Sequence, residues 1–585
     1  MKTTIHVGWN LWRPSLIFSI VLSLQLATQD AFSQDGVTRY VRFSDDAGTH
    51  SGILEGNTIR VLDGDPVFDD GVSPTGRTLA VGSVELEIPM NPERVPNVMG
   101  VAGNSNNPNG QEVEVNHPRW FGKANTSLAK NGSPVEVPYG ATNFNFEGEL
   151  GLIIGREGRH IPESEAMDYL FGVTVGNDWS ENDWCGERRG IEEPTHVFCK
   201  AGDTFATLGD AVVTGLDLRD LQISVRLNGV LAAQGTSADF RDSPASLISK
   251  ISHYVTLKRG DIIFTGTVAP PQMRGTRRQL WQEDVIEVEI ENVGTVSNQL
   301  VRVTSQNVSG PEISAADGTY VRFQHAGGTA FGMLNGNEVR ELDGDPIGGN
   351  ASMTGQTFDV SDIELGLPLD PAKPGRKVLA AAANYQPSNA PPRQVPHPRF
   401  LFKRSTALSS DGNVVERPPE VEMFIPEGEL VLVIGRRGRH IPVNEVSNYI
   451  FGVAAGNDWS ELSWITAGPG PRPLKYVSKA TDTWAGIANQ IVRGIDYSDL
   501  QITTHVNGEL LSQGQSSTMI NNPARLVSYL SRYMTLEPGD LIYTGAISPE
   551  PGMRRNLRVG DSVTVEVEGI GSMEQQVVAM PPWPH

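Results

Sequence analysis

Two glutamates, Glu147 and Glu149, open an apolar run that continues to Gly155. Because alternate side chains of a strand point to the same face, the two carboxylates are predicted to share one face. Carboxylates this close repel each other unless a cation lies between them. A third carboxylate, Asp178, and a lysine, Lys200, follow in the chain. Three carboxylates and one lysine predict an oxygen-ligand site for a hard metal cation, with a cationic anchor beside it.

A Glu-x-Glu pair alone can equally be the solvated face of a strand, but the whole set occurs twice. The second set, Glu427, Glu429, Asp458 and Lys479, follows the first at an offset of 280 residues, or 279 for the lysine. Such a constant offset over a long span indicates an internal duplication. We therefore expect two metal sites, one in each repeat.

The duplication includes a segment before each site. The strand-like stretch 40–43 and the turn 63–66 recur as 320–323 and 343–346. Strand, turn and strand in this order predict a small β unit. The predicted organisation is a signal peptide (1–33), a small β subdomain (38–92) and a large domain (93–303) of repeat 1, a linker (304–317), and a small β subdomain (318–372) and a large domain (373–580) of repeat 2.

The N-terminal segment has the features of an export signal. Lys2 and Arg13 precede an apolar stretch, residues 15–27, that is too short to span a bilayer. Residues 31–33, Ala-Phe-Ser, fit the small-x-small rule for cleavage before Gln34. We expect an exported protein, periplasmic or secreted, that does not contact the membrane after the signal is removed. The alternative is an uncleaved N-terminal anchor.

The net charge of −22 makes nucleic acid an unfavourable partner, because phosphate contacts need clustered lysines and arginines. The chain has only two cysteines, Cys185 and Cys199, and their counterparts in repeat 2 are Ile465 and Ser478. Their joint absence from repeat 2 suggests a disulfide, which an oxidising compartment would allow. Two unpaired buried cysteines are the alternative interpretation.

Strands dominate the rest of each repeat, with few helices. Helices are predicted over 162–170 and over 243–254, where Ser243 or Asp242 is the candidate cap. Asn228-Gly229 predicts a hairpin turn. The Asn, Pro and Gly-rich loop 104–110 is a candidate lid over the site. Lys123 and Lys403 are interpreted as solvated or salt-bridged positions.

In order, the motifs of each repeat resemble those of the fumarylacetoacetate hydrolase C-terminal domain family. They are Glu-x-Glu-Leu before an apolar strand, Phe-Gly-x-x-x-Gly-Asn-Asp-x-Ser, a lysine with a nearby aspartate, and Gly-Asp-x-Ile-x-Thr-Gly. The resemblance implies a β-rich α+β fold with two tandem mixed β-roll domains, each preceded by the small β piece. It also implies that the two domains pair as an intramolecular pseudo-dimer, and it leaves further homo-oligomerisation open.

The resemblance implies Mg²⁺, Mn²⁺ or Ca²⁺ as cofactor and a small oxo acid as ligand. Its metal ligands would be Glu147, Glu149 and Asp178, and Glu427, Glu429 and Asp458. Its catalytic residues would be Lys200, Lys479, Thr265 and Thr544. The implied activity is C–C hydrolysis, decarboxylation or keto–enol isomerisation of a 2-oxo or β-diketo acid through a metal-stabilised enolate.

One part of the family pattern is missing. Hydrolases and decarboxylases of the family carry Asn-Tyr-x-x-His-x-x-Glu on the lid, whereas neither repeat has this His and Glu. The alternative function is therefore an exported pseudoenzyme that binds metal and a small acid without turnover. A third option is one active half: Thr267 against Ala546 favours repeat 1, and Tyr385 against Ser105 favours repeat 2.

Overall fold

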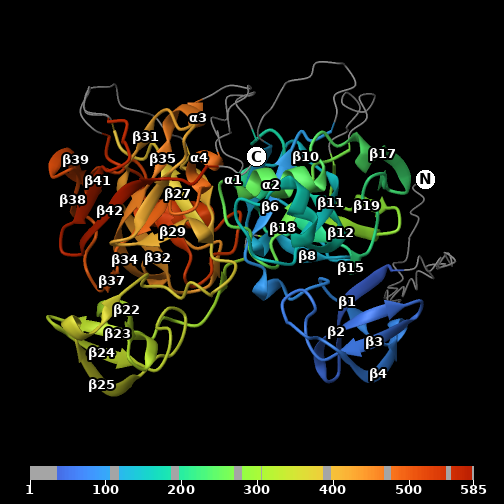
Figure 1. The fold of residues 1–585 in the computed structure, drawn as a ribbon, viewed down its shortest axis with the longest axis horizontal. Coiled ribbons are helices and arrows are strands. Elements are labelled where there is room, and N and C mark those ends of the chain that lie inside the picture. Colours follow the sequence, from blue (N-terminus) through green and yellow to red (C-terminus); the bar gives the residue numbers. More distant parts are fainter. Residues whose placement is uncertain are drawn as a thin grey trace, which may run out of the picture. The chain divides into compact units, whose positions relative to one another are not determined.

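The structure is a computed structural model in which residues 36–105, 118–185, 197–268, 280–304, 306–386, 397–466, 476–548 and 555–582 are described. The predicted signal peptide and most of the predicted lid lie outside these residues. The β-rich architecture predicted from the sequence is confirmed, with two copies of the same domain (Figure 1). Among the described residues, no helix is both long and apolar enough to cross a membrane.

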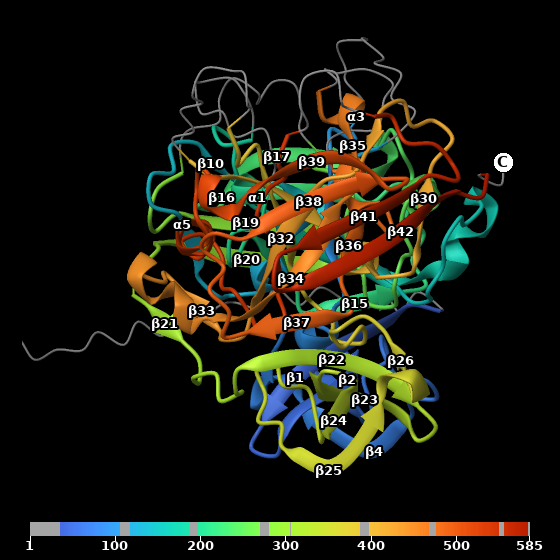
Figure 2. The same cartoon turned by 90° about the vertical axis from the view of Figure 1, so that its left-hand side faces the viewer.

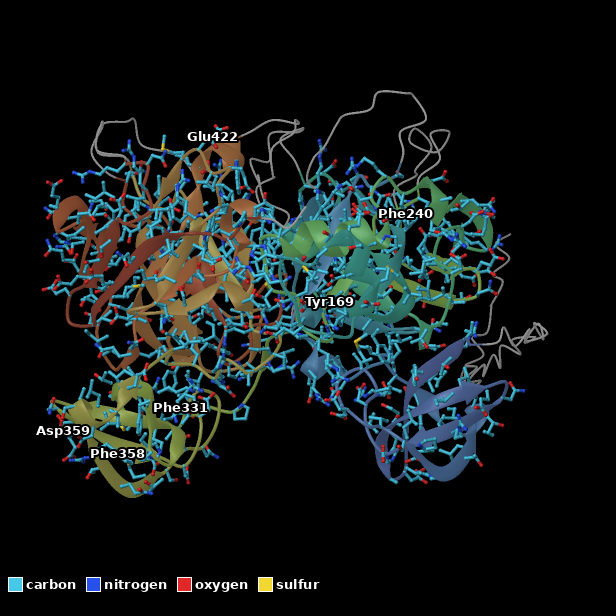
Figure 3. All side chains as sticks on the ribbon, in the orientation of Figure 1. Tyr169, Phe240, Phe331, Phe358, Asp359 and Glu422 are labelled. Atoms are coloured by element: carbon cyan, nitrogen blue, oxygen red, sulfur yellow. A yellow bond between two sulfur atoms is a disulfide. The ribbon has the colours of Figure 1, made fainter. Side chains whose placement is uncertain are left out.

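Each repeat begins with a small antiparallel sheet, drawn in blue for repeat 1 and yellow-green for repeat 2 (Figure 1). In repeat 1 its strands are β1 (Thr38–Asp45), β2 (Gly48–Glu55), β3 (Thr58–Leu62), β4 (Pro74–Ala80) and β5 (Glu85–Leu86). In repeat 2 they are β22 (Gly318–His325), β23 (Gly328–Asn335), β24 (Glu338–Leu342), β25 (Met353–Asp359) and β26 (Glu364–Leu365). Apolar side chains pack on both of its faces, as Phe331 and Phe358 illustrate (Figure 3).

The small sheet continues into the main sheet, which carries the predicted site residues. In repeat 1 the order after β1 is β15 (Ala211–Thr214), β12 (Leu170–Asp178), β11 (Gly148–Ile154), β18 (Ile262–Phe264), β6 (Val98–Ala102) and β7 (Arg119–Lys123), with β14 (Ala206–Leu208) and β8 (Leu128–Lys130) beside it. In repeat 2 the order after β22 is β37 (Gln490–Arg493), β34 (Ile450–Asp458), β32 (Gly428–Ile434), β40 (Leu541–Tyr543), β27 (Val378–Ala382) and β28 (Arg399–Lys403), with β36 (Ala485–Ile487) and β29 (Leu408–Ser410) beside it.

A second sheet covers the main sheet of each repeat, and Figure 2 shows its long strands in repeat 2. Its strands in repeat 1 are β17 (Val230–Thr236), β16 (Gln222–Leu227), β19 (Val285–Ile290), β20 (Gly294–Arg302) and β9 (Val135–Val137). In repeat 2 they are β39 (Glu509–Gln515), β38 (Gln501–Val506), β41 (Ser562–Val567), β42 (Gly571–Ala579) and β30 (Val414–Arg417). Leu150, Leu152, Val225 and Val288 fill the space between the sheets in repeat 1.

The remaining elements are short. They are the two-stranded pairs β10 (Phe144–Asn145) with β13 (Ser180–Glu181) and β31 (Phe424–Ile425) with β35 (Ser460–Glu461), and the helices α1 (Val197–Lys200), α2 (Pro244–Ser252), α3 (Leu462–Thr466), α4 (Val477–Ala480) and α5 (Pro523–Leu530). Helix α2 confirms the helix predicted over 243–254, and Ser243 is its cap. The hairpin predicted at Asn228 is also confirmed, by β16 and β17.

One segment differs from the sequence-based expectation, and another, the predicted linker 304–317, contains a short strand. The helix predicted over 162–170 is a 3₁₀ helix, Glu163–Tyr169: its first turn closes with an i→i−3 bond from the Glu165 N–H to Pro162 O at 3.0 Å, and no side chain caps it. The predicted linker contains β21 (Val308–Ser309), which pairs with β33 (Gly438–Arg439) of repeat 2. Backbone hydrogen bonding thus fastens this stretch to the second repeat.

The two repeats contact each other through interactions that occur twice with the roles exchanged. Asp482 accepts hydrogen bonds of 2.6 Å from the backbone N–H and the hydroxyl of Thr256. Its counterpart Asp203 accepts bonds of 3.0 and 2.6 Å from the same groups of Thr535. Likewise, Arg159 pairs with Glu416, and Arg439 with Glu136. Such reciprocity is the mark of an isologous, twofold-like interface.

Some interface contacts are not reciprocal, and the contact made by Glu420 is one of them. Glu420 of repeat 2 accepts a hydrogen bond of 2.5 Å from the Tyr254 hydroxyl, and its Oε1 lies 3.2 Å from His253 Nε2. Burial raises the pKa of Glu420, but the hydrogen bonds from His253 and Tyr254 outweigh it and lower the pKa to about 2. The counterpart of Glu420 in repeat 1 is Gly140, which cannot form this contact.

Because its folded-state pKa is depressed, ionised Glu420 stabilises the fold fully above the unfolded pKa. That contribution is lost as the pH falls from about 4.5 to about 2. After solvent screening it is worth about 1–2 kcal/mol. We expect the free energy of unfolding of Glu420→Gln to fall less than that of wild type as the pH is lowered through this window. Urea unfolding at a series of pH values measures it. The exposed control Glu312→Gln should follow wild type, and parallel curves for Glu420→Gln and wild type would contradict the assignment.

Candidate metal centre

The structure brings the three predicted carboxylates of repeat 1 together. One oxygen of each of Glu147, Glu149 and Asp178 lies within 4.8 Å of the others. The antiparallel register of β11 and β12 places Gly148 opposite Asn177, so that Asp178 lies beside Glu147. The Asp178 N–H donates to Glu147 O at 2.8 Å, and the Glu147 N–H donates to Asn177 Oδ1 at 2.8 Å. Asn177 therefore holds the two segments together through its side chain.

Lys200 lies against this cluster. Its Nζ donates to Glu147 Oε2 at 2.7 Å and to Asp178 Oδ2 at 2.8 Å. Burial alone would lower the pKa of Lys200, but the attraction of Asp178, Glu147 and Glu149 outweighs it and raises the pKa. The ammonium therefore stays charged at neutral pH. It can hold an anion.

A second lysine contributes to the cluster, a role that the sequence analysis did not assign to it. Lys123, at the end of β7, is fully buried and its Nζ lies 2.5 Å from Asp178 Oδ1. Burial lowers the pKa of Lys123 to about 8, against the attraction of Asp178. Of the two alternatives left open, the salt-bridged one is correct. The available signal was that Lys403 lies 280 residues later, in register with the carboxylates.

The donor set fits a divalent cation. All three side chains offer carboxylate oxygens, which hard cations prefer. Glu149 is fully buried, and its Oε1 has no hydrogen-bond partner among the described residues. Burial and repulsion from Asp178 and Glu147 raise the pKa of Glu149 well above its ordinary value. A cation would supply the partner and the positive charge that this carboxylate lacks.

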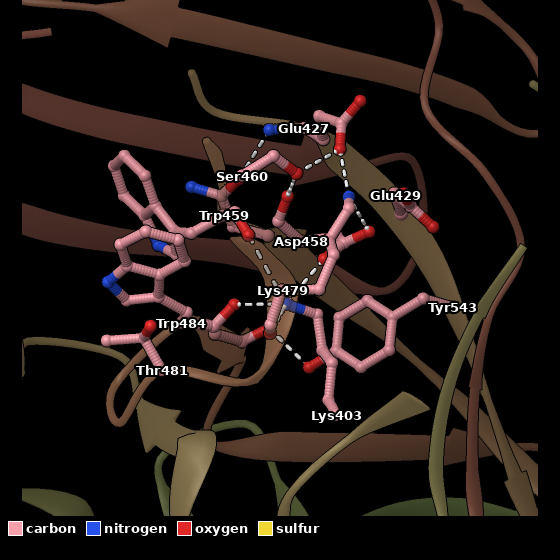
Figure 4. A network of polar contacts seen from close by, with 12 residues as sticks. Lys403, Glu427, Glu429, Asp458, Trp459, Ser460, Lys479, Thr481, Trp484 and Tyr543 are labelled. Atoms are coloured by element: carbon pink, nitrogen blue, oxygen red, sulfur yellow. Dashed lines mark hydrogen bonds and ion pairs between the residues drawn. The ribbon is translucent and has the colours of Figure 1, made fainter. Parts of the chain in front are cut away.

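The cluster recurs in repeat 2 with the same parts (Figure 4). Lys479 donates to Glu427 and, at 2.5 Å, to Asp458 Oδ2. Lys403 Nζ lies 2.6 Å from Asp458 Oδ1 and donates to the carbonyl oxygens of Lys479 and Trp484 at 2.7 and 2.8 Å. The two sites therefore share one charge arrangement: three carboxylates and two lysines.

The Thr-Gly turn after β18 closes the site from the side of the main sheet. The Gly266 N–H donates to Glu149 Oε2 at 2.7 Å, and the Gly545 N–H donates to Glu429 Oε2 at 2.6 Å. Gly266 has φ +99°, and a Cβ there would lie 2.8 Å from Asn104 Cβ, so only glycine fits. Thr265 and Thr544 are fully buried in this turn; the Thr544 hydroxyl donates to Leu430 O at 2.9 Å.

The two sites differ in their surroundings. In repeat 1, Cys185 and Cys199 form a disulfide, as one of the two interpretations predicted. It joins the segment after β13 to α1, next to Lys200. In repeat 2, the buried side chain of Tyr385 takes the place of Ser105. The sequence offers Glu112 and Glu114 as substitutes for the missing lid His and Glu of repeat 1, and Arg188 and Arg189 as contacts for an anion or as part of a surface loop, but all four lie outside the described residues.

A small cavity adjoins the site of repeat 2. Its volume is about 40 Å³ and Glu427 forms part of its wall. The rest of its lining is mostly apolar, with one guanidinium: Ile425, Pro426, Leu511, Ala546, Ile547, Ser548 and Arg555.

The buried ion pairs can be tested by removing Lys123. Lys123→Met leaves Asp178 with one lysine in place of two, so we expect a loss of about 3–5 kcal/mol in the free energy of unfolding in urea. Adding Asp178→Asn should recover part of it, because the uncompensated charge is removed. Lys258→Met, at an exposed ion pair with Glu157, serves as the control and should cost less than about 1 kcal/mol. A Lys123→Met loss as small as the control would contradict the ion-pair assignment.

Comparison with known proteins identifies both repeats. The family model described as fumarylacetoacetate (FAA) hydrolase C-terminal matches residues 94–301 and 375–578. The model described as Rv2993c-like, N-terminal, matches residues 38–89 and 319–368. These matches cover the main body and the small sheet of each repeat.

Similar proteins include enzymes. A 4-hydroxyphenylacetate degradation bifunctional isomerase/decarboxylase of Escherichia coli is 26% identical over 465 residues, 79% of this chain and 90% of that protein. A mitochondrial oxaloacetate tautomerase of Homo sapiens is 33% identical over 198 residues, 33% of this chain and 62% of that protein. The solved 5-carboxymethyl-2-hydroxymuconate delta-isomerase of Mycobacterium smegmatis is 29% identical, covering 45% of this chain and 100% of its own, with a TM-score of 0.39.

Since the FAA hydrolase model matches more than half of the chain, the family assignment predicted from the motifs is confirmed. The protein belongs to the fumarylacetoacetate hydrolase family and carries two tandem copies of its C-terminal domain.

Proposed function

We propose that the protein is a divalent-metal-dependent enzyme that isomerises or decarboxylates a small 2-oxo or β-diketo acid. The observation that carries the proposal is the buried carboxylate triad with a charged lysine beside it, present in both repeats. Relatives named as an isomerase/decarboxylase and as an oxaloacetate tautomerase support this reaction class.

Each part of the site has a definable role in this reaction. Glu147, Glu149 and Asp178 would hold the cation, which when bound would act as a Lewis acid toward a carbonyl oxygen. Lys200, kept charged by its neighbours, would hold the carboxylate of the acid. Lys123 is too deeply buried to reach a ligand and instead fixes Asp178. The same roles fall to Glu427, Glu429, Asp458, Lys479 and Lys403 in repeat 2.

Of the reactions that the family supports, isomerisation fits this chain best, because the family's hydrolases and its decarboxylases both carry the lid His and Glu that neither repeat has. Hydrolysis needs a base that activates water, and neither repeat has the His and Glu that supply it in the family's hydrolases. Lys200 and Lys479 are already engaged, since each ammonium donates to a glutamate and to the aspartate of its own cluster. Isomerisation needs chiefly a polarised carbonyl and an anchored carboxylate.

The second candidate is a binding protein that takes up metal and a small acid without turnover. The missing His and Glu in both repeats favour it. The two candidates share the metal site and differ in turnover, so one series of measurements separates them.

Calorimetry of the metal-free protein with Mg²⁺, Mn²⁺ and Ca²⁺ tests the shared site. We expect the wild-type chain to bind two cations. Either single variant, Glu149→Gln or Glu429→Gln, should bind one cation, because the substitution removes a charged ligand from one site. The double variant should bind none. Exposed Glu163→Gln is the matched control and should keep both cations. If the wild-type protein binds none of these cations, both candidate functions are contradicted.

The ligand and the reaction are tested next. Oxalate should bind only to the metal-loaded protein, and Lys200→Met/Lys479→Met should weaken it by at least about tenfold, the cost of one charge-assisted contact. Oxaloacetate and acylpyruvates are then assayed for enol–keto interconversion by ultraviolet absorbance and for CO₂ release. Turnover that the Glu149→Gln/Glu429→Gln variant lacks supports the enzyme. Metal-dependent oxalate binding without turnover of any of these acids supports the binding protein.

We further propose that the protein acts outside the cytoplasm. The signal-like residues 1–33 and the disulfide between Cys185 and Cys199 both support export. Mass spectrometry of the full-length gene product from a fractionated bacterial host should find a chain that begins at Gln34 and has no free thiol. An intact N-terminus with two free thiols in the cytoplasmic fraction would contradict export.

A further inference from the structure

The interface between the repeats is reciprocal at most contacts, but a buried charge cluster breaks the symmetry. Arg404 of repeat 2 extends into repeat 1, where its Nη2 lies 2.8 Å from Asp261 Oδ2 and donates to Thr256 O at 3.2 Å. Both charged side chains are 0% exposed. The counterpart of Arg404 in repeat 1 is Ala124, which cannot make the reciprocal contact.

The reciprocal aspartate obtains its cation from its own repeat. Asp540, the counterpart of Asp261, lies 2.8 Å from Lys377 Nζ, and both side chains are 1% exposed. The counterpart of Lys377 in repeat 1 is Asn97, a neutral residue that donates to Asp261 Oδ1 at 2.8 Å. Asp261 thus depends on the other repeat for its positive charge, whereas Asp540 does not.

A second position is asymmetric in shape. Tyr476 of repeat 2 lies over Gly122 of repeat 1 and packs edge-on against Trp120, with ring centroids 4.8 Å apart. A Cβ on Gly122 would lie 2.6 Å from Tyr476 Oη, so no side chain fits there. The corresponding pair of positions has the sizes reversed. Repeat 2 carries the large Phe402 where repeat 1 has Gly122, and repeat 1 carries the smaller Val197 where repeat 2 has Tyr476.

We propose that these positions form a pairing code that lets repeat 1 associate with repeat 2 but prevents either repeat from associating with its own kind. The code consists of Asn97, Gly122, Ala124 and Val197 in repeat 1, and Lys377, Phe402, Arg404 and Tyr476 in repeat 2. The partner that fits repeat 1 is therefore the second repeat of this chain, or that of another copy.

Each homotypic pairing is unfavourable for two independent reasons. A pair of first repeats would set Ala124 opposite Asp261, leaving a buried carboxylate without a cation, and would leave a cavity between Gly122 and Val197. A pair of second repeats would bring Arg404 against the existing pair of Lys377 and Asp540, adding an unpaired buried cation. It would also force Phe402 against Tyr476.

A single substitution in the full-length chain can reproduce each of these unfavourable combinations. A second substitution should then restore a favourable combination. Arg404→Ala imitates the charge pattern of two first repeats, and Asn97→Lys that of two second repeats. We expect each to lower the midpoint of thermal unfolding by about 3–4 °C. The double variant Asn97→Lys/Arg404→Ala recreates the Lys377–Asp540 arrangement, so it should return to within about 1 °C of wild type.

The steric element is tested by a separate cycle, so the proposal stays testable if one variant fails to fold. Gly122→Phe should be destabilising because Tyr476 occupies the space, and Tyr476→Val should be destabilising because it leaves a cavity. Gly122→Phe/Tyr476→Val recreates the Phe402 and Val197 combination and should be more stable than Gly122→Phe.

Arg94→Ala, at an exposed ion pair with Asp69, is the control for the loss of an arginine in Arg404→Ala and should leave the midpoint of thermal unfolding within about 1 °C of wild type.

Recovery in the double variants is the result expected of complementary residues. If both double variants instead lose the sum of their single losses, the residues act independently and the pairing code is wrong. If Asn97→Lys or Gly122→Phe alone leaves the midpoint unchanged, the corresponding element of the code does not discriminate between partners and the proposal fails for it.

Discussion

Repulsion among three carboxylates held within 4.8 Å of one another is the constraint on which the rest of each repeat depends. Burial increases that repulsion, because the surrounding protein screens charge far less than water does. The chain meets it with two lysines per site, one deeply buried beside the aspartate and one closer to solvent that also reaches a glutamate. The two lysines offset the carboxylate charge only in part. The remaining negative charge is what a cation at the proposed metal site would neutralise.

The lysines depend in turn on the other repeat. Phe198, two residues before Lys200, packs against Phe400 and Tyr533 across the interface, and Asp203 is fixed by Thr535. On the other side, Tyr476 and Asp482 bracket Lys479 and are held by Trp120 and Thr256. Each lysine-bearing helix is only four residues long and could not hold its position alone. The pairing of the repeats is therefore part of how each site is built.

Much of the site could be predicted from sequence because it repeats. Glu147, Glu149 and Asp178 were found from their types and spacing, and the offset of 280 residues confirmed that the set was not accidental. The contact of Lys123 with the cluster could not be predicted, because a lone lysine after an aromatic stretch carries no local signal. Its role comes from a strand that reaches Asp178 only in the folded sheet. The α-helix expected over 162–170 failed for a related reason: acidic residues after a proline suggest a helix start but do not determine its hydrogen-bond pattern.

The interface residues could not have been found from one repeat alone. Arg404 and Tyr476 become informative only when their partners across the interface, Asp261 and Gly122, are known, and no sequence pattern links positions so far apart. The duplication that reveals the site also conceals these residues, because comparing the repeats draws attention to what they share rather than to where they differ.

The disulfide of repeat 1 has a practical consequence for anyone preparing this protein. Cys199 directly precedes Lys200, whereas Ser478 precedes Lys479, so thiol oxidation alters the neighbourhood of one site only. Material made in a reducing cytoplasm would be a mixture of chains that differ at the first site and agree at the second. A ligand titration of such material would average over two forms of the first site, so complete oxidation is the condition under which the two halves can be compared.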